Sequence, residues 1–322
     1  MATIRDIAKK AGVSVGTASR AITGNGYVSE ETRAHILAIA EDLGYKPKEH
    51  IRPAGTSRTV GIVIPDITFP FYGAFLKYAE VVLAQKGYKT VVCNALGVQD
   101  RVGEMITMLE KRELDGIILN ADVTGEEIVR LEKLPVVCLE RLLGDKIPMI
   151  SSDHRQGGQL AAAEFLRSGC KNVLMLTAKH SNQLFGDIRI TECQRILQEQ
   201  NVSVTVAEIP GAMLSYKFLK DLTAEYTRLY SSADGVFTDD IMAYCYLEET
   251  RQLGIRVPEQ LAIVGYDGND IIRISSPRIT TVEQNVPLLA RTCVETLLRR
   301  IAGESAERQT LIPVSFYRGG TT

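Results

Sequence analysis

The distribution of apolar residues after position 60 is the feature that most constrains the fold. Short runs that are apolar throughout alternate there with segments of helical length, such as 60–66 as a strand, 71–86 as a helix and 89–94 as the next strand. Strands of this kind are buried on both faces, as in parallel sheets that helices cover on both sides. The chain is therefore predicted to be an α/β protein with doubly wound parallel sheets. Further strands are predicted at 116–119, 136–139, 149–152, 172–176, 202–209, 235–238 and 262–265.

Two stretches of this region are similar to each other. Asp115-Gly116-Ile117-Ile118 lies 55 residues after Val60, and Asp234-Gly235-Val236-Phe237 lies 62 residues after Asn172. Two halves built on one plan would produce this spacing, and so would a chance match of a short Asp-Gly motif. Both interpretations stay open at this point.

The first 46 residues have a different pattern, that of three short helices. The first covers 4–11, the second begins after Ser14, which can cap it, and the third begins after Ser29. Two short helices joined by a tight glycine-containing turn, with a third as a brace, indicate an all-α helix-turn-helix unit. The formal net charge of the chain is −2, yet residues 1–60 carry nine Lys and Arg against six Asp and Glu. The first unit is therefore the part expected to meet an anionic partner.

The polar residues that follow the predicted strands are the candidate ligand contacts. In open parallel sheets, ligands bind beyond the carboxyl ends of the strands. Polar groups that donate and accept hydrogen bonds suit a polyol, and Phe69, Phe71 and Tyr72 can stack on a sugar face. The alternative is that the acidic residues only cap turns and helices. The residues at these ends are Asp66, Asn94, Asn120, Glu140, Arg141, Asp153, Thr177, Asp239, Asp240, Asp267 and Gln284.

Signatures of enzymes, metal sites and membrane segments are missing from the sequence. It has no phosphate-binding GxxxxGK[ST] loop, no GxSxG elbow, no GxGxxG after a strand and no HExxH. We therefore predict no catalytic residues, no cofactor and no metal ligands. The six Cys are isolated, as expected for buried thiols in a reducing cytosol, and no apolar run is long enough for a membrane helix. A cytoplasmic, nucleoid-associated protein is expected.

The second helix carries the strongest signal for nucleic acid. In a helix-turn-helix, this helix enters the major groove and its first turns meet base edges. Thr17 and Ser19 offer hydroxyl groups to phosphates, and Arg20 can form two hydrogen bonds to guanine.

At this point the sequence resembles the LacI-type transcription regulators, which include the lac, galactose and purine repressors. The resemblance covers nearly the whole chain and continues through Asp234–Asp240, Val264–Asp267 and Ile279–Gln284. In the first unit it rests on Thr3–Ala8, Ala11–Ser14, Thr17–Arg20, Val28–Arg33 and Leu43–Pro47.

The resemblance implies a homodimer that binds a pseudo-palindromic double-stranded DNA operator. It also implies a periplasmic-binding-protein-like core that holds a small effector between two subdomains. The implied division is a DNA-binding head at 1–46, a linker at 47–59 and a core at 60–322, with an N-subdomain at 60–153 and 286–310 and a C-subdomain at 154–285 and 311–318.

Site residues are carried over by position in the same way. The residues at or near the DNA are Ser14, Val15, Gly16, Thr17, Ser19, Arg20 and Tyr27. The residues in contact with the effector are Asp66, Phe71, Tyr72, Glu140, Arg141, Arg189, Asp239, Asp267 and Gln284. Within the family, Ile150–Asp153, Gly157-Gly158, Ala161–Ala163 and Gly169–Asn172 are similar to sucrose-operon repressors. Sucrose or a fructose derivative is therefore the leading effector of a repressor that controls a carbohydrate operon.

Three departures from the family pattern bear on this interpretation. The usual Ala-Arg-Ser-Leu of the linker is replaced by Ile51-Arg52-Pro53-Ala54, followed by Gly55, so its minor-groove wedge is in doubt. Gly16 replaces a base-reading side chain, and Glu192 introduces a carboxylate that can pair with Arg189 or alter the pocket. A sugar-binding or sugar-processing protein with a vestigial head, and a regulator with a nucleobase effector, therefore stay open as alternatives.

Overall fold

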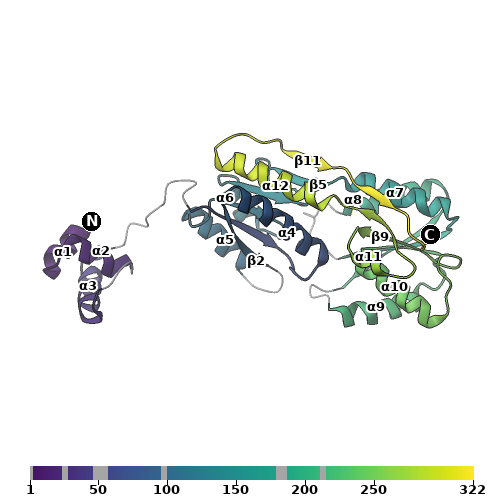
Figure 1. Ribbon diagram of the computed structural model, residues 1–322, viewed down its shortest axis with the longest axis horizontal. Coiled ribbons are helices and arrows are strands. Elements are labelled where there is room, and N and C mark those ends of the chain that lie inside the picture. The colour runs from purple at the N-terminus through teal and green to yellow at the C-terminus, as the bar shows by residue number, and fades with distance from the viewer. Residues whose placement is uncertain (1–2, 24–27, 46–56, 96–99, 179–186, 211–214) are drawn as a thin grey trace. The chain divides into compact units, whose positions relative to one another are not determined.

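The computed structural model describes residues 3–23, 28–45, 57–95, 100–178, 187–210 and 215–322. The chain divides into two compact units, 1–51 and 52–322 (Figure 1). Tyr27 and the linker residues Ile51 to Gly55 lie outside the described residues, so the predictions made for them stay predictions.

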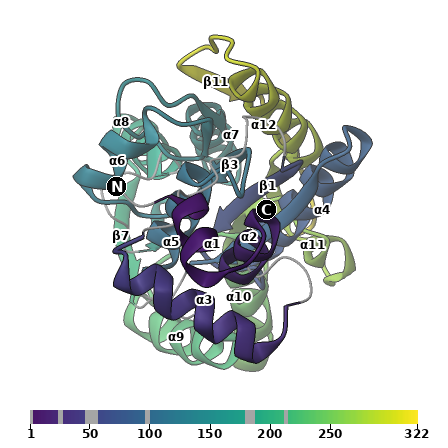
Figure 2. The same cartoon turned by 90° about the vertical axis from the view of Figure 1, so that its left-hand side faces the viewer.

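The first unit consists of helices α1 (Ile4–Ala11), α2 (Val15–Thr23) and α3 (Glu30–Asp42), as predicted (Figure 2). Thr3 and Asp6 form a reciprocal capping box at the start of α1, and Gly12 ends that helix with a left-handed φ of 66°. The three helices share a small apolar core made of Ile7, Ala8, Ala18, Ala21, Ile36 and Ala40.

The second unit contains two six-stranded sheets. The first sheet has the order β11-β5-β4-β3-β1-β2, and all its neighbours are parallel. Helices α4 and α12 cover one face and α5 and α6 the other. Its elements are β1 (Thr59–Ile64), α4 (Pro70–Gln85), β2 (Lys89–Asn94), α5 (Arg101–Glu110), β3 (Gly116–Leu119), α6 (Gly125–Leu131), β4 (Val136–Leu139), β5 (Met149–Ser152), α12 (Val286–Ile301) and β11 (Gln309–Ile312).

The second sheet repeats this plan with the order β12-β10-β9-β8-β6-β7, so β6 to β10 correspond to β1 to β5. Only β12 is antiparallel to its neighbour. Helices α7 and α8 pack on one face and α9 and α10 on the other. Its elements are α7 (His154–Arg167), β6 (Asn172–Ala178), α8 (Ile188–Glu199), β7 (Ser203–Ile209), α9 (Tyr216–Leu229), β8 (Gly235–Phe237), α10 (Asp240–Leu253), β9 (Ala262–Asp267), α11 (Ile271–Ile274), β10 (Thr280–Glu283) and β12 (Ser315–Tyr317).

The chain passes between the two sheets after β5, β10 and β11. Helix α7 follows a strand of the first sheet but packs on the second, and α12 follows a strand of the second sheet but packs on the first. These reciprocal exchanges bring the ends of β5 and β10 together, where the Ser152 hydroxyl donates to the Gln284 side-chain oxygen at 2.5 Å.

The predicted α/β class with two doubly wound sheets is confirmed, but β10, β11 and β12 are absent from the sequence prediction. Strand β10 was missed because its residues Thr280 and Thr281 are polar, although both side chains are fully buried and hydrogen-bonded. Strands β11 and β12 are short edge strands with exposed residues. Leu311 and Ile312 pair with β5 and thus lie in the first sheet.

Candidate functional site

Helix α2 of the first unit presents a solvent-exposed face opposite its buried side. Ala18 and Ala21 pack inward, whereas Val15, Gly16 and Arg20 are exposed. The Ser14 hydroxyl accepts the backbone N–H of Thr17 at 3.1 Å and so caps the helix, as predicted.

The predicted base-reading residues of α2 thus lie on its solvent side. The Arg20 Nε donates to the Gly16 carbonyl at 3.1 Å, which keeps the guanidinium along the helix. Thr17 and Ser19 are half-buried beside this face.

In the second unit, Arg141 stands at the end of β4 and is buried. Its Nε donates to the Asn120 side-chain oxygen at 2.9 Å, and its Nη1 pairs with Asp122. The Asn120 amide in turn donates to the Tyr72 hydroxyl at 3.4 Å, and burial raises the pKa of Tyr72. At the ends of β3 and β4, hydrogen bonds through Asn120 therefore link the Arg141 guanidinium to the Tyr72 hydroxyl.

Glu140, the residue before Arg141, is buried in a left-handed conformation with φ 59°. Its carboxylate accepts the Ser151 hydroxyl at 2.6 Å and the Ser152 N–H at 3.0 Å, and it contacts the His154 Nε2. Burial alone would raise the pKa of Glu140, but His154 and the two hydrogen bonds lower it below the ordinary value. A backbone strain of this kind, held by several partners, is typical of functional sites.

His154 joins the two halves and was missed by the sequence analysis. Its Nδ1 lies 2.8 Å from the Tyr266 hydroxyl of β9, while its other ring nitrogen contacts Glu140 of the first half. The preceding residue, Asp153, was noted as a strand-end residue, but His154 was not because it already belongs to α7. Its position directly after a strand end is the signal that could have found it.

A second connection between the halves runs through Gln284. The Gln284 Nε2 donates to the Asp267 carboxylate at 2.7 Å, and its Oε1 accepts the Ser152 hydroxyl. Asp267, the last residue of β9, is 7% exposed and has a φ of 109°. Burial, with the charges of Asp239 and Glu140, raises the pKa of Asp267 to about 7, although Arg189 and Gln284 act in the opposite direction.

Two further acids surround Asp267. Asp239 caps α10 by accepting the N–H groups of Ile241 and Met242 at 2.9 and 3.1 Å. Burial raises the pKa of Asp239, and burial with the charge of Asp267 raises that of Asp240 well above its ordinary value.

Arg189 is the cation of this group. Its guanidinium lies over the Tyr266 ring, 4.2 Å from the ring centre, and interacts with the charges of Asp267 and Asp239. Seven of the predicted effector contacts, Tyr72, Glu140, Arg141, Arg189, Asp239, Asp267 and Gln284, therefore belong to interacting groups at the strand ends.

The other two predicted contacts differ in their surroundings. Asp66 accepts the N–H and hydroxyl of Thr68 at 2.9 and 2.8 Å and so orders the loop after β1. Phe71 of α4 is 6% exposed and packs in the apolar core, and its ring is steeply inclined to that of Tyr72 with the ring centres 5.2 Å apart.

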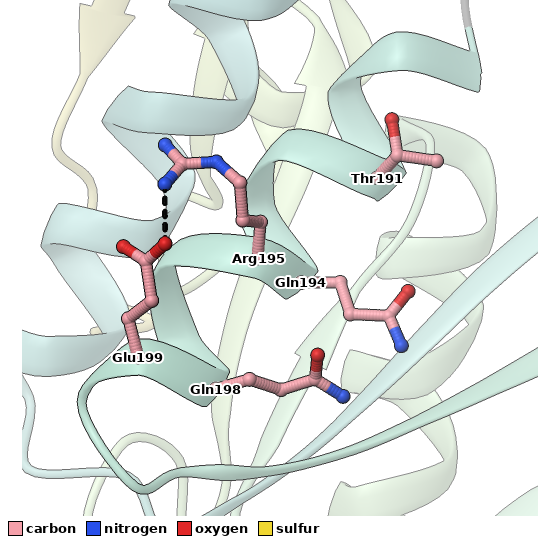
Figure 3. Close-up of a pocket in the computed structure, with 5 residues that line it drawn as sticks. All are labelled: Thr191, Gln194, Arg195, Gln198 and Glu199. Carbon is pink, nitrogen blue, oxygen red and sulfur yellow. Dashed lines mark hydrogen bonds and ion pairs between the residues drawn. The ribbon is translucent and has the colours of Figure 1, made fainter.

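Among the described residues, Glu192 forms its ion pairs with Arg155 and Arg195 and not with Arg189. Its buried carboxylate accepts from Arg155, Arg195 and Gln159 at 3.0 to 3.3 Å, and these partners lower the pKa of Glu192 to about 2. Arg195 also pairs with Glu199 on a shallow polar depression of α8, which Figure 3 shows in close-up. None of the predicted effector contacts lines that depression.

Comparison with known proteins fits this architecture. Residues 3–48 match the family described as "Bacterial regulatory proteins, lacI family", 57–192 match "Periplasmic binding proteins and sugar binding domain of LacI family", and 162–322 match "Periplasmic binding protein-like domain". The sucrose operon repressors of Pediococcus pentosaceus and Streptococcus mutans are 33% and 30% identical to this chain; each alignment covers 99% of it and 98% and 99% of the relative. The chain belongs to the LacI family.

A solved structure agrees with this membership at the level of the fold. The fold of the whole chain resembles that of a "transcriptional regulator CelR-cellobiose complex", with a TM-score of 0.71, 24% identity and complete coverage of both chains. The resemblance seen in the sequence and the predicted architecture of a LacI-type regulator are therefore confirmed. Within the described part of the chain, no helix is long and apolar enough to cross a bilayer, and no group of three or more His, Cys, Asp or Glu could hold a metal ion.

Proposed function

We propose that this LacI-family protein is a cytoplasmic transcriptional repressor of a carbohydrate operon that binds a pseudo-palindromic operator as a homodimer. A small uncharged sugar bound at the strand ends sets its operator affinity. The observation that carries the proposal is the pair of polar connections across the two sheets, Glu140–His154–Tyr266 and Ser152–Gln284–Asp267. A ligand at these strand ends would contact both halves at once.

The charges of the site favour a neutral polyol over an anionic ligand. Arg141 is paired with Asp122, and Arg189 interacts with Asp239 and Asp267, so both guanidinium groups already have acidic neighbours. The raised pKa values of Asp239, Asp240 and Asp267 show that burial disfavours negative charge at these strand ends, so an added phosphate or carboxylate would be unfavourable there as well. Hydroxyl groups instead donate to the carboxylates and accept from the amides and guanidinium groups.

We propose sucrose or a fructose derivative as the effector. This choice rests on the names of the two relatives, which are sucrose operon repressors covered over nearly their whole length. The proposed contacts are the residues predicted from the sequence, with Tyr72, Glu140, Arg141, Arg189, Asp239, Asp267 and Gln284 as the central set.

The proposed mechanism is a change in the closure of the two halves. A ligand shifts such an equilibrium only through unequal affinity for the two states, with coupling of about 1–3 kcal/mol, or roughly 5- to 150-fold in operator affinity. We propose no catalytic step, because the polar groups at the strand ends act as hydrogen-bonding partners of a bound sugar. Incubation with sucrose should return the sugar unchanged.

The test is fluorescence anisotropy at fixed salt with the pseudo-palindrome upstream of the gene, half-sites about 10 bp apart, against scrambled DNA. We expect preference for the operator and an affinity that sucrose changes at least fivefold. A response to nucleobases but not to sugars would contradict the effector, and no preference over scrambled DNA would favour a binding protein with a vestigial head.

A pair of variants tests the exposed face of α2. Arg20→Ala removes both the charge and the capacity for bidentate hydrogen bonding, whereas Arg20→Lys keeps the charge alone. If Arg20 reads a base, both variants should lose the preference for operator over scrambled DNA, and Arg20→Lys should retain its affinity for scrambled DNA. Unchanged preference in both would remove Arg20 from the proposed contacts.

A further inference from the structure

The two Asp-Gly motifs noted in the sequence have the same role in the two halves. In the second half, the Asp234 carboxylate accepts the backbone N–H groups of Lys171 and Asn172 at 2.8 to 3.0 Å and so fixes the start of β6. In the first half, Asp115 fixes the start of β1. The spacing repeat is thus a repeated structural device.

The Asp115 carboxylate accepts hydrogen bonds from three donor groups, whereas the Asp234 carboxylate accepts them from two. Asp115 accepts the Ser57 N–H at 3.1 Å, the Ser57 hydroxyl at 2.7 Å and the Arg58 N–H at 2.9 Å. The Asp115 side chain is 6% exposed, so these bonds are largely shielded from water. Arg58 is held in a left-handed conformation with φ 49°, and its guanidinium lies over the Tyr88 ring. A strained non-glycine residue of this kind persists only where its surroundings fix it.

The segments of the chain that precede β6 and β1 come from different parts of the protein. The chain that reaches β6 comes from α7 of the same unit. The chain that reaches β1 comes from the DNA-binding head, because Ser57 follows the segment that joins the head to the core. Asp115 therefore holds the first described residues of the core on the path from the head.

Two rigid elements connect Asp115 to the strand-end site. Strand β3 begins directly after Asp115 and, four residues and about 13 Å later, ends next to Asn120. Helix α12 begins directly after Gln284 and Asn285, and its Leu297 and Ile301 pack on Gly116, where an added Cβ would lie 2.9 and 3.0 Å from them. A change at either end of these elements thus has a continuous packed route to the linker.

We propose that Asp115 is the positioning residue that couples the effector site to the DNA-binding head, by fixing the direction in which the linker leaves the core. The inference rests on the proposed function. A fixed exit limits the conformations of the two heads before they bind, which lowers the entropic cost of engaging both half-sites. It also lets a movement of β3 or α12 reach the linker.

The test compares Asp115→Asn with the matched control Asp234→Asn in the full-length protein. Each substitution replaces one accepting oxygen with a donor, but only the first lies on the path to the head. We expect Asp115→Asn to weaken operator binding about tenfold without ligand and to reduce the sucrose effect to less than twofold. Sucrose affinity measured calorimetrically without DNA should stay within twofold of wild type.

The control should keep operator affinity and the sucrose effect within twofold of wild type. Hydrogen exchange should accelerate at Ser57 and Arg58 in the first variant and at Lys171 and Asn172 in the control. If Asp115→Asn folds poorly, Ser57→Ala removes one of the three bonds, together with the bond that the Ser57 hydroxyl accepts from the Thr59 N–H, and should give an intermediate loss.

The outcomes separate this inference from the proposed function. Operator affinity and sucrose effect that stay wild-type in Asp115→Asn, with fast exchange at Ser57 and Arg58, would overturn the inference. Equal losses in both variants would also overturn it, because they indicate general destabilisation. If sucrose leaves wild-type affinity unchanged, the sugar proposal fails, while the ligand-free comparison of the two variants still decides the role of Asp115. A wild-type protein without operator preference would overturn both.

Discussion

Glu140 and Asp267 occupy equivalent places in the two halves, yet their protonation is controlled in opposite directions. Each follows or ends the fourth strand of its half, each is buried, and each has a positive φ, 59° and 109°. The pKa of Glu140 is lowered, and that of Asp267 is raised to about 7. The repeated backbone thus provides the same position twice, and the neighbouring side chains decide its charge.

The neighbours explain the difference. Glu140 accepts from two serines and contacts His154, which together outweigh the cost of burial. Asp267 has Gln284 as its hydrogen-bond donor, and it lies near two more acids with Arg189 as their cation. Glu140 in the first half therefore stays ionised, whereas the charge of Asp267 in the second half can change when a ligand binds or the pH changes.

Removal of each carboxylate in turn should give the largest difference in stability between the two halves. Glu140→Ala removes the carboxylate that accepts from the Ser151 hydroxyl and the Ser152 N–H and that contacts His154, and we expect a loss of about 4 kcal/mol in the free energy of unfolding. Asp267→Ala should cost about 1 kcal/mol at pH 8, because burial of this charge is itself unfavourable. Urea denaturation at pH 8 measures both. Equal losses would show that the two carboxylates contribute alike and would contradict the comparison.

The pH dependence of stability should identify Asp267 in particular. Because its pKa is about 7 in the folded protein and about 3.8 ordinarily, the folded state retains a proton that the unfolded chain has released between these values. This contribution to stability is fully present below pH 4 and is lost as the pH rises through 7. From pH 5 to pH 8 wild type should lose about 2.5 kcal/mol more than Asp267→Asn. Parallel pH profiles for the two proteins would argue against a raised pKa.

The backbone plan could be predicted from sequence better than these charges. Continuous apolar runs such as 116–119 and 136–139 match β3 and β4 because burial on both faces requires apolar residues. Strand β10 lacks that signal, since the Thr281 hydroxyl is satisfied by Asp240, which is distant in sequence.

The crevice rule brought Glu140 and Asp267 into the candidate site because it depends only on where strands end. It could not foresee their opposite pKa shifts. His154 and two hydrogen bonds lower the pKa of Glu140, whereas burial and the charge of Asp239 raise that of Asp267 against the opposing charge of Arg189, and only the folded chain brings these residues together.

Helix α7, which packs on the second sheet, and helix α4, which packs on the first, differ in how closely their glycines approach neighbouring atoms. An added Cβ at Gly158 of α7 would lie 2.5 Å from the Arg189 carbonyl oxygen of α8, whereas at Gly73 of α4 it would lie 3.5 Å from the nearest atom. Gly158→Ala should therefore cost about 2 kcal/mol, and Gly73→Ala should gain about 0.5 kcal/mol from helix propensity. Thermal unfolding of both variants checks the signs. A neutral Gly158→Ala would mean that α7 and α8 can separate freely.

The finest test concerns two strand hydroxyls that each donate to a buried acid at 2.6 Å, Ser151 to Glu140 and Thr281 to Asp240. Hydrogen bonds to ionised acceptors contribute about 1.5–3 kcal/mol and neutral ones about 0.5–1.5 kcal/mol. Because the pKa of Glu140 is lowered and that of Asp240 is raised well above its ordinary value, Ser151→Ala should cost about 1 kcal/mol more than Thr281→Val. Unfolding measured at increasing pH sharpens the comparison, since the cost of Thr281→Val should grow as Asp240 ionises while that of Ser151→Ala stays constant. A cost of Thr281→Val that is independent of pH would mean that Asp240 carries the same charge as Glu140, and the asymmetry between the halves would then rest on Asp267 alone.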